Sequence, residues 1–414
     1  MLVLRLPRRA ACSFAAALLV AAALPLVVLA AEVPSLRVAT SGDYAPFSVT
    51  AADGRRAGLD IAVAERLARD LGVRVEWVRL AWPELGTATA AASFDVAMSG
   101  ITMRADRAMV GAFTRPYATS GAMVLVRASD AARFADIDDL DRAGVRIAVN
   151  AGGHLEAVAR RRFARAAITP IADNQAVPAA LRRGDADAAV TDSAELSAWL
   201  APDVVARGPF TRDYKAYLVP AARSALARRM DDWLRDREAD GWLDAERRRW
   251  LGADAHLDAA AAARQAVAAL IRLRLALMPD VAAAKRAAGL PIEDRGQEAR
   301  VLERARAQAP SAPARAAAVF AELIEMAKAV QRAAEPTPTA HSLESLRAAL
   351  RRIDTALYGE LDRLPASPTA AWRAALADAL PGADAAALDR LTAALAAPEH
   401  AAPPQGARRA RGAR

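Results

Sequence analysis

Hydrophobic positions follow two different patterns along the chain. Between residues 35 and 252, short apolar runs rich in β-branched residues alternate with amphipathic stretches such as residues 59–72. The runs are residues 35–39, 73–78, 94–100, 122–127, 145–150, 166–171 and 188–192. Alternating strand and helix patterns are typical of an α/β fold, so we expect this region to form mostly parallel sheets.

Polar loops follow several of these predicted strands. In open α/β sheets, ligands bind at the loops beyond the carboxyl ends of the strands. Residues 41–44, 98–103, 150–153 and 191–195 occupy such positions. We therefore take Ser99, Asn150, Gly153 and Asp192 as candidate ligand-binding residues.

The strand pattern ends near residue 256, and the sequence that follows is rich in Ala, Leu and Arg at helical spacing. Proline-containing breaks interrupt it at residues 289–294, 309–313, 335–339 and 365–370. This pattern predicts several helices and no strands. We expect an α/β domain over residues 35–252, an all-α domain over residues 256–397 and a basic, disordered tail over residues 398–414.

The first 31 residues have the composition of a secretory signal peptide. Arg5, Arg8 and Arg9 precede an apolar run over residues 10–29, and Ala30 and Ala31 supply small residues for cleavage. A transmembrane anchor is the alternative, because the run is nearly long enough to span a bilayer. We expect export to the periplasm, with no attachment to the membrane after cleavage.

The net charge of +8 does not by itself indicate a nucleic-acid partner. Three arginines lie in the leader and four in the tail, which leaves the rest of the chain close to neutral. We expect no nucleic-acid groove. The tail is expected to be solvated, and contact with an anionic surface is the alternative.

Cysteine and histidine usage limits the chemistry further. The one cysteine, Cys12, lies in the leader, and the four histidines form no Cys/His cluster. We expect no disulfide, no thiolate nucleophile, no metal site and no cofactor.

Three polar residues occupy helical positions that should be apolar. Arg274 and Lys285 are eleven residues apart, which is about three turns at roughly 3.6 residues per turn, so they share one face. Gln331 ends a second apolar row. Polar groups inside a helix bundle cost free energy unless they are paired, so we expect the helices to enclose an anionic ligand. Snorkelling of these side chains to the surface is the alternative.

Five motifs in the first region occur together: GDYAPF (42–47), AWPEL (81–85), AGVRIAVNAGG (143–153), TDSAE (191–195) and YKAYLVP (214–220). In combination they resemble the type-II periplasmic solute-binding proteins, and more narrowly the cyclohexadienyl dehydratases. The resemblance implies two lobes that close on a small ligand. It also implies that Arg107 clamps a carboxylate through its guanidinium fork. Glu195 would be the general acid when prephenate or arogenate loses carbon dioxide and hydroxide, because a desolvated carboxyl group retains its proton.

Both assignments have alternatives. Arg107 is one arginine among many on the chain, and Glu195 is also placed to stabilise a helix N-terminus. Asp192 would cap that helix, and in plain binding proteins of this kind such an aspartate often holds a ligand ammonium group. The sequence departs from the dehydratase pattern at Ala122, where a lysine is expected, and at residues 154–155, where Thr-Asn is expected.

Two basic residues of this region stay open to more than one interpretation. His154 is either a substitute hydrogen-bond donor to the ligand or an exposed loop residue. Lys215 is expected to be a structural residue of a hinge strand rather than a catalytic one.

The helical region contains RLALMPDVAAAK (274–285), GLPIED (289–294) and FAELIEMAKAVQ (320–331). Their joint spacing resembles the secreted γ subclass of chorismate mutases, an all-helical family that is often dimeric. The resemblance implies that Lys285 and Gln331 hold the ether oxygen of chorismate. It implies that Arg274 holds a carboxylate and that Arg347 closes over the substrate.

Other positions of the helical site are less regular. Asp294 is either an orienting residue or a helix cap. Gln297 stands where the family pattern has an arginine; a lost charge-assisted hydrogen bond costs about 1.5–3 kcal/mol, and Arg295 is a possible compensating cation. Lys328 is expected to lie on a solvated face.

The combined interpretation is a periplasmic bifunctional enzyme of phenylalanine biosynthesis. The helical domain would convert chorismate to prephenate, and the α/β domain would convert prephenate to phenylpyruvate or arogenate to phenylalanine. One rival keeps the mutase and makes the first domain a binding module for an amino acid or another solute. A second rival makes both domains inactive sensors. A homodimer is possible.

Overall fold

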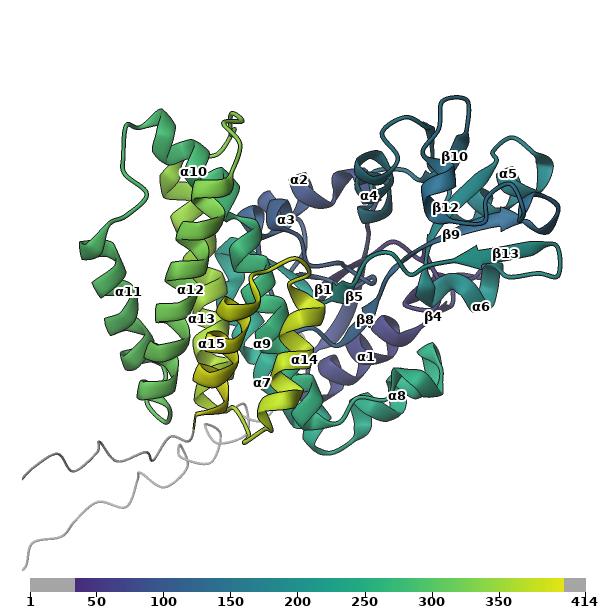
Figure 1. Cartoon of the computed structure of the whole chain (residues 1–414). Coiled ribbons are helices and arrows are strands. Elements are labelled where there is room, and N and C mark those ends of the chain that lie inside the picture. Colours follow the sequence, from purple (N-terminus) through teal and green to yellow (C-terminus); the bar gives the residue numbers. More distant parts are fainter. Residues whose placement is uncertain (1–33, 398–414) are drawn as a thin grey trace, which may run out of the picture. The chain divides into compact units, whose positions relative to one another are not determined.

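The α/β region is built around two five-stranded sheets in the computed structural model of this chain, which describes residues 34–397 (Figure 1). The first sheet has the order β5-β1-β6-β15-β7. Its strands are β1 (Ser35–Thr40), β5 (Arg74–Arg79), β6 (Val96–Ala97), β7 (Gly111–Phe113) and β15 (Leu218–Pro220). Strand β1 pairs in parallel with β5 and β6, whereas β15 is antiparallel to β6 and β7.

The second sheet has the order β11-β10-β12-β9-β13. Its strands are β9 (Ala122–Arg127), β10 (Arg146–Asn150), β11 (Ala167–Ile171), β12 (Ala188–Asp192) and β13 (Val204–Arg207). Here too β10 is parallel to both of its neighbours and β9 is antiparallel to both of its own. Each sheet forms the centre of one lobe.

The expectation of mostly parallel sheets is confirmed for four of the five strands of each sheet, and a single strand in each, β15 in the first and β9 in the second, runs antiparallel. The cause is the path of the chain, which leaves the first lobe after β7, enters the second through β9 and returns through β15. These two strands run against the parallel set of the lobe that they enter. The two crossing segments pair with each other as β8 (Ala118–Ser120) and β14 (Asp213–Lys215), an antiparallel ribbon between the lobes.

Short helices cover the sheets and terminate where the sequence supplies turn residues. They are α1 (Leu59–Leu71), α2 (Leu85–Ala90), α3 (Ala105–Val110), α4 (His154–Arg162), α5 (Val177–Arg183), α6 (Leu196–Trp199), α7 (Ser224–Ala239) and α8 (Trp242–Leu251). Helix α1 buries Leu59, Val63 and Leu67 along one face. It ends at Gly72, whose φ of 67° favours glycine because a Cβ is strained there. A small sheet of β2 (Asp43–Tyr44), β3 (Ser48–Thr50) and β4 (Arg56–Ala57) completes the first lobe.

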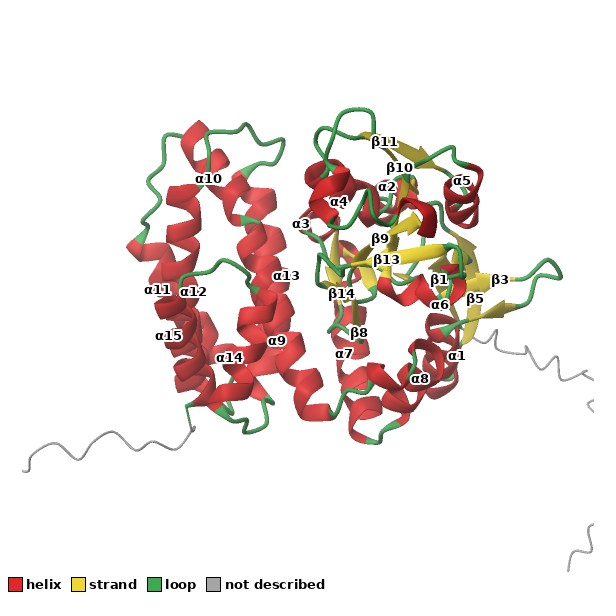
Figure 2. Cartoon of the chain, turned by 45° about the vertical axis from the view of Figure 1, so that its right-hand side comes forward, coloured by secondary structure: helices red, strands yellow, loops and turns green. Residues whose placement is uncertain are grey.

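The region after residue 256 consists of helices joined by loops, as its sequence pattern predicts (Figure 2). The long helices are α9 (Ala259–Ala276), α10 (Met278–Ala287), α11 (Arg295–Gln308), α12 (Pro313–Ala333), α13 (Leu343–Asp362), α14 (Thr369–Ala379) and α15 (Ala385–Ala396). All four predicted breaks coincide with loops. Pro313 begins α12, where its missing N–H group has no helical partner to lose.

One break within the helical region was not predicted. Leu277 separates α9 from α10, and Pro279 lies in the first turn of α10. Proline cannot donate a hydrogen bond to the preceding turn, so the chain bends there. Arg274 and Lys285 nevertheless remain on a common side, because both line the same cavity.

The structure bears on some of the sequence-based expectations and not on others. The signal peptide over residues 1–31 and the basic tail over residues 398–414 lie outside the described residues. Among residues 34–397, no helix has both the length and the apolar character needed to cross a membrane. The two-lobed α/β region followed by an all-helical region is confirmed.

Removal of core volume from α13 should destabilise the helical region. The Leu357 side chain is fully buried, so Leu357→Ala is expected to lower the free energy of unfolding by about 3 kcal/mol through lost apolar burial and a residual cavity. Urea titration followed by far-UV circular dichroism measures the change. Leu290, which is 46% exposed, provides the control, and Leu290→Ala should change stability by no more than about 0.5 kcal/mol. Equal losses in the two variants would contradict this view of the core.

Candidate active sites

A narrow cavity of about 30 Å³ lies where the two lobes meet the β8–β14 ribbon. The residues that line it are Tyr44, Trp82, Gly100, Thr102 and Arg107 from the first lobe, Asn150, Gly153, His154, Leu155, Asn174 and Glu195 from the second, and Lys215 from the ribbon. Four predicted residues are therefore brought together, namely Arg107, Asn150, Gly153 and Glu195. A ligand larger than a few atoms enters only if the lobes move apart.

Glu195 is the most strongly perturbed carboxyl group of this cavity. It is 1% exposed, and its oxygens accept hydrogen bonds from the Asn174 side-chain amide at 2.6 Å and from the Thr191 hydroxyl at 2.7 Å. Burial raises the pKa of Glu195 from 4.5 to about 8, against the opposing effect of these two bonds. The side chain also closes a capping box with Asp192 at the start of a short 3-10 turn, residues 193–195. The catalytic and the capping interpretations are thus compatible.

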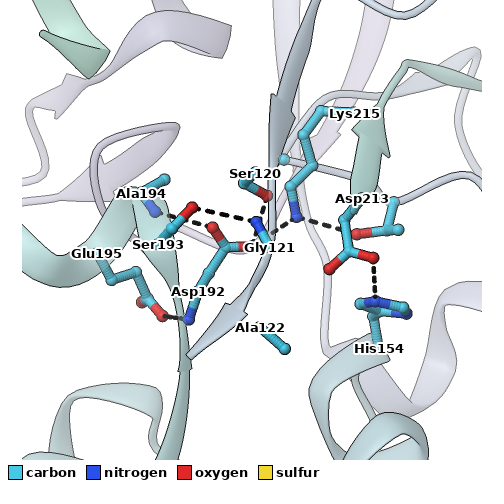
Figure 3. Close-up of polar contacts among 12 residues, drawn as sticks. Ser120, Gly121, Ala122, His154, Asp192, Ser193, Ala194, Glu195, Asp213 and Lys215 are labelled. Atoms are coloured by element: carbon cyan, nitrogen blue, oxygen red, sulfur yellow. Dashed lines mark hydrogen bonds and ion pairs between the residues drawn. The ribbon is translucent and has the colours of Figure 1, made fainter. Parts of the chain in front are cut away.

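Asp192 does not reach the cavity wall. It is fully buried, and its Oδ2 atom accepts hydrogen bonds from the Ser120 hydroxyl at 2.8 Å and Lys215 Nζ at 2.9 Å (Figure 3), and from the Tyr44 hydroxyl at 2.8 Å. Its Oδ1 atom accepts from the backbone N–H of Ala194 at 2.9 Å. The sequence placed Asp192 among the ligand contacts, whereas the structure uses both of its oxygens inside the protein.

Lys215 is both structural and part of the cavity. Its ammonium group is buried and donates to Asp192 and to the Thr102 hydroxyl at 2.9 Å each. It comes from β14, 93 residues after Ala122 in the sequence, and its ammonium group contacts Asp192, the cross-strand partner of Ala122. Ala122 itself is fully buried in β9 and does not line the cavity.

His154 is not an exposed loop residue. It is the first residue of α4, and its Nε2 atom lies 2.9 Å from Asp213 Oδ1 (Figure 3). Burial is the main effect that lowers the pKa of the imidazole, and the Asp213 carboxylate partly offsets it. The same contact helps to hold the pKa of Asp213 below its ordinary value despite burial. His154 therefore presents an uncharged ring to the cavity at neutral pH.

The remaining predicted residues differ in how they contribute. Arg107 is buried and donates from Nη1 to the Thr102 carbonyl at 2.9 Å; burial and the neighbouring Arg104 lower its pKa to about 10. Asn150 donates to the Ile171 carbonyl at 3.3 Å. Ser99 is buried among Ser41 and Ser48 and does not line the cavity, so the structure does not support it as a ligand contact.

Five residues that line this cavity had no role assigned from the sequence, namely Tyr44, Trp82, Gly100, Thr102 and Asn174. Tyr44 and Trp82 belong to the quoted GDYAPF and AWPEL motifs, so the signal was present without an assigned role. Asn174 has no such motif. It is found only through its 2.6 Å contact with Glu195, which joins residues 21 positions apart.

A second cavity, of about 300 Å³, lies among helices α9 to α13. Its lining residues include Arg274, Lys285, Asp294, Gln297, Gln331 and Arg347, so all the predicted residues of this region are brought together. Glu298, Arg304, Lys328, Arg351 and Asp354 also line it. The wall is therefore rich in cations, with apolar side chains such as Val281 and Ile324 between them.

Two buried groups of this cavity keep unused hydrogen-bonding capacity. Arg274 is 6% exposed and donates from Nε to Asp354 Oδ1 at 2.9 Å, but its Nη1 atom has no partner among the described residues. Gln331 is also 6% exposed, and its Oε1 atom likewise lacks a partner within residues 34–397. Buried polar atoms are rarely left in this state unless a ligand or water completes them.

Lys285 and Asp294 also line this cavity. Lys285 Nζ donates to the Ile292 carbonyl at 2.6 Å, and burial lowers its pKa from 10.5. Asp294 caps α11 by accepting a hydrogen bond from the Gln297 backbone N–H at 2.9 Å. Its carboxylate also acts on Lys285, whose pKa it raises in part. Asp294 is therefore a helix cap, and its orienting role in the site stays a prediction.

Two expectations for the helical region are wrong. The Arg295 side chain is 90% exposed and pairs with Glu293, so it does not compensate for Gln297. Arg304 and Arg351 line the cavity instead. Lys328 is 8% exposed rather than solvated, because it lies in the cavity wall between Glu298 at 3.4 Å and Glu325 at 2.6 Å. The sequence of α11 does not show which side of that helix faces the cavity, because α11 is polar on most sides.

Groups of three or more His, Cys, Asp or Glu residues placed to hold a metal ion do not occur within residues 34–397. Neither cavity is lined by a cysteine, and Cys12 precedes the described residues. The interlobe cavity therefore offers hydrogen-bond donors, cations and the protonated Glu195, and the helical cavity offers cations together with the carboxyl groups of Asp294, Glu298 and Asp354.

Comparison with known proteins agrees with this division. Residues 36–253 match the bacterial extracellular solute-binding proteins, family 3, and residues 262–332 match chorismate mutase type II. The chain is 38% identical to a cyclohexadienyl dehydratase of Pseudomonas aeruginosa over 52% of its own length and 82% of that protein. It is 26% identical to the L-cystine-binding protein TcyJ of Escherichia coli over 53% of its length and 84% of that protein.

A solved structure gives the same fold for the first region. The ancestral amino acid-binding protein AncCDT-1, described as a precursor of cyclohexadienyl dehydratase, is 32% identical with a TM-score of 0.50, and the match covers 52% of this chain and 95% of that one. The chain therefore belongs to the bacterial extracellular solute-binding proteins of family 3, as a homologue of cyclohexadienyl dehydratase that carries a chorismate mutase type II domain after the binding-protein fold.

Proposed function

We propose that this chain is a bifunctional enzyme of phenylalanine biosynthesis that converts chorismate to prephenate in its helical domain and then prephenate to phenylpyruvate in its two-lobed domain. The observation that carries the first half is the 300 Å³ cavity, which Lys285 lines together with Arg274 and Gln331, two buried residues that each keep a polar atom without a partner among the described residues. The observation that carries the second half is Glu195, a carboxyl group whose pKa of about 8 keeps it protonated at neutral pH.

The mutase step needs only binding and electrostatics. Chorismate carries two carboxylates, and its ether oxygen gains negative charge as the C–O bond breaks. Lys285 and the Gln331 side chain are proposed to stabilise that oxygen, which favours the transition state over the ground state. Arg274 is proposed to bind one carboxylate through its Nη1 atom, which has no partner among the described residues, and Arg347 to bind the other. Gln297 contributes hydrogen bonding without charge.

The dehydratase step needs a proton. The ring hydroxyl of prephenate leaves as water when Glu195 protonates it, and the electron pair of the breaking bond to the ring carboxylate completes the aromatic ring as carbon dioxide departs. Glu195 then regains a proton from solvent. Arg107 is proposed to hold the side-chain carboxylate of the substrate, with Asn150 and the Gly153 backbone in the wall around it.

The two steps are consecutive, so a single chain keeps the source of prephenate close to the site that consumes it. The family is one of extracellular proteins, and the leader composition favours secretion into the periplasm. The resemblance of the helical domain to dimeric mutases supports a homodimer, which light scattering of the purified chain tests.

Two rival functions make different predictions. A non-catalytic binding module for an amino acid is favoured by the names of some relatives and by Ala122 and Leu155. Tight binding of an unreacted amino acid, with prephenate left intact, would establish it. A pair of inactive sensor domains would leave chorismate unchanged.

Lys285→Ala should abolish most mutase activity. The substitution removes the cation nearest the developing charge, so kcat/KM for chorismate is expected to fall by about 100-fold or more. The decrease in chorismate absorbance measures it. Arg295→Ala is the matched control, because Arg295 is an exposed cation ten residues away that does not line the cavity. Similar losses in both variants would argue against the assigned role of Lys285.

Glu195→Gln should stop the sequence at prephenate. The amide keeps the size of the side chain but supplies no acidic proton, so phenylpyruvate formation is expected to fall by about 100- to 10,000-fold while chorismate is still consumed. A coupled assay that starts from chorismate follows both compounds. Glu65→Gln on the exposed side of α1 serves as the control. Unchanged phenylpyruvate formation in the Glu195 variant rules out this proton donor.

The pH dependence of dehydration should report the Glu195 carboxyl group. Since its folded pKa is about 8 against an ordinary value of 4.5, kcat/KM for prephenate should fall about tenfold per pH unit above about 8. Because the pKa of Glu195 is higher in the folded state than in the unfolded state, protonation of this group stabilises the fold. This contribution to the free energy of unfolding is complete below pH 4.5 and is lost as the pH rises through about 8. The alkaline decrease in rate and the steeper loss of stability should both be missing from Glu195→Gln. A rate profile that stays flat in this window would disprove the assignment.

A further inference from the structure

We infer that Arg304 is a further substrate-binding residue of the helical cavity, where its guanidinium group binds one carboxylate of the dianionic substrate together with Arg274. This inference rests on the proposed mutase function and adds a residue to its site. Arg304 lies outside the motifs that the sequence offered for this region. Its role follows from how the charges in the cavity wall are paired.

Helix α11 presents Arg304 to the cavity. The helix begins after its cap, Asp294, and Gln297, Val301 and Arg304 follow at intervals of four and three residues. Residues at these intervals lie on one face of a helix, and all three line the cavity. Arg304 is half-buried, and its side chain makes no hydrogen bond or ion pair with another of residues 34–397. It is therefore a cation that the described part of the chain does not neutralise.

The other cations that line the cavity have different surroundings. Lys328 is paired with two glutamates, at 2.6 and 3.4 Å, so its charge is balanced inside the protein. Burial lowers the pKa of Lys285, and the nearby charge of Arg347 lowers it further, so Arg347 lies close to Lys285. Arg351 is exposed, and solvent screens its charge. None of these three residues acts on the carboxylate that holds Arg274.

Arg274 alone does not bring a net positive charge to the site. Its Nε atom lies 2.9 Å from Asp354 Oδ1, and the side chains are only 7% and 11% exposed. The pair is close to neutral, although Arg274 Nη1 has no partner among the described residues. A substrate carboxylate that accepts a hydrogen bond from Nη1 adds a second negative charge to one guanidinium group. Two carboxylates that share one cation in a buried site repel each other.

Arg304 supplies the positive charge that this arrangement needs. Burial raises the pKa of Asp354, and the guanidinium groups of Arg274 and Arg304 both oppose that rise. Burial and Asp354 likewise raise the pKa of Tyr358, one turn further along α13, and Arg304 opposes them. The charge of Arg304 therefore acts at the Arg274–Asp354 pair. Once a carboxylate is bound, two cations face two anions, and the buried group is electrically balanced.

The step of the reaction that Arg304 affects follows from this position. A carboxylate of the substrate keeps its charge throughout the rearrangement, whereas the ether oxygen gains charge in the transition state. An interaction with the carboxylate therefore stabilises the ground state and the transition state to a similar extent. Loss of Arg304 should raise KM with little change in kcat, whereas Lys285→Ala should lower kcat.

Steady-state kinetics of the purified full-length chain with chorismate test this role. Arg304→Met removes the charge and keeps a long side chain, so KM should rise about 10- to 100-fold, the range for one lost charge-assisted hydrogen bond. The change in kcat should be no more than about threefold. Arg306→Met is the matched control, because Arg306 is exposed on the same helix and does not line the cavity. An unchanged KM in Arg304→Met, or an equal rise in Arg306→Met, overturns the inference.

Two further measurements separate the possible causes of a negative result. Arg304→Gln, a second neutral substitution, should show the same rise in KM and decides the question if Arg304→Met fails to fold by circular dichroism. Turnover of chorismate with a KM that is insensitive to both substitutions removes only the role of Arg304. Absence of turnover in the unaltered chain removes the proposed mutase function as well.

A double-mutant cycle with Asp354 tests the electrostatic cause. Asp354→Asn removes the carboxylate that neutralises Arg274, so Arg274 alone can then balance the bound substrate carboxylate. The rise in KM caused by Arg304→Met should therefore be at least about threefold smaller in the Asp354→Asn background than in the unaltered chain. The same rise in both backgrounds would show that Arg304 does not act as the counter-charge to this pair.

Discussion

The buried ion pair between Asp192 and Lys215 is the interaction on which the two-lobed half of the molecule depends. It joins the end of β12 in the second lobe to β14 of the crossing ribbon, and Tyr44 of the first lobe donates to the same oxygen. A buried pair of this kind is tolerated only when hydrogen bonds complete it, and here they come from three separate parts of the chain. The pair therefore fixes the ribbon, the capping turn and the acid Glu195 in one arrangement.

The helical half uses charge in the opposite way. Its cations are not fully paired within the protein, since Arg274 is bound to Asp354 through one nitrogen only and the amide oxygen of Gln331 has no described partner. A cavity wall of this composition is rich in cations and has hydrogen-bonding atoms without partners among the described residues. Such a wall suits a dianion whose charge moves during the reaction. The two-lobed half thus pairs Asp192 with Lys215 inside the protein, whereas the helical half leaves atoms of Arg274 and Gln331 without a partner among the described residues.

Sequence reasoning reached the residues whose neighbours are fixed by local spacing. Lys285 follows Arg274 at a helical interval, and Glu195 lies in a compact turn motif, so the sequence was enough to bring both to a cavity wall. The partners of Lys215 and His154 were not found, because Asp192 and Asp213 are distant in the sequence and the contacts arise only when the chain crosses between lobes twice. Arg295 was chosen for its nearness to Gln297, whereas the direction of the side chain around α11 decides exposure. The one antiparallel strand in each sheet was not predicted for the same topological reason.

The double crossing of the chain has a consequence for the order in which the lobes can form. Residues 121–212 make the second lobe as one uninterrupted stretch, whereas the first sheet is incomplete until β15 inserts between β6 and β7. Because the chain is synthesised from its N-terminus, the second lobe can form completely while the first sheet still lacks β15 between β6 and β7. The first lobe is synthesised earlier, but its sheet is complete only after the later strand β15 has been made. Until then β6 and β7 have unpaired edges, so the risk of mispairing with other strands is highest at this stage of folding.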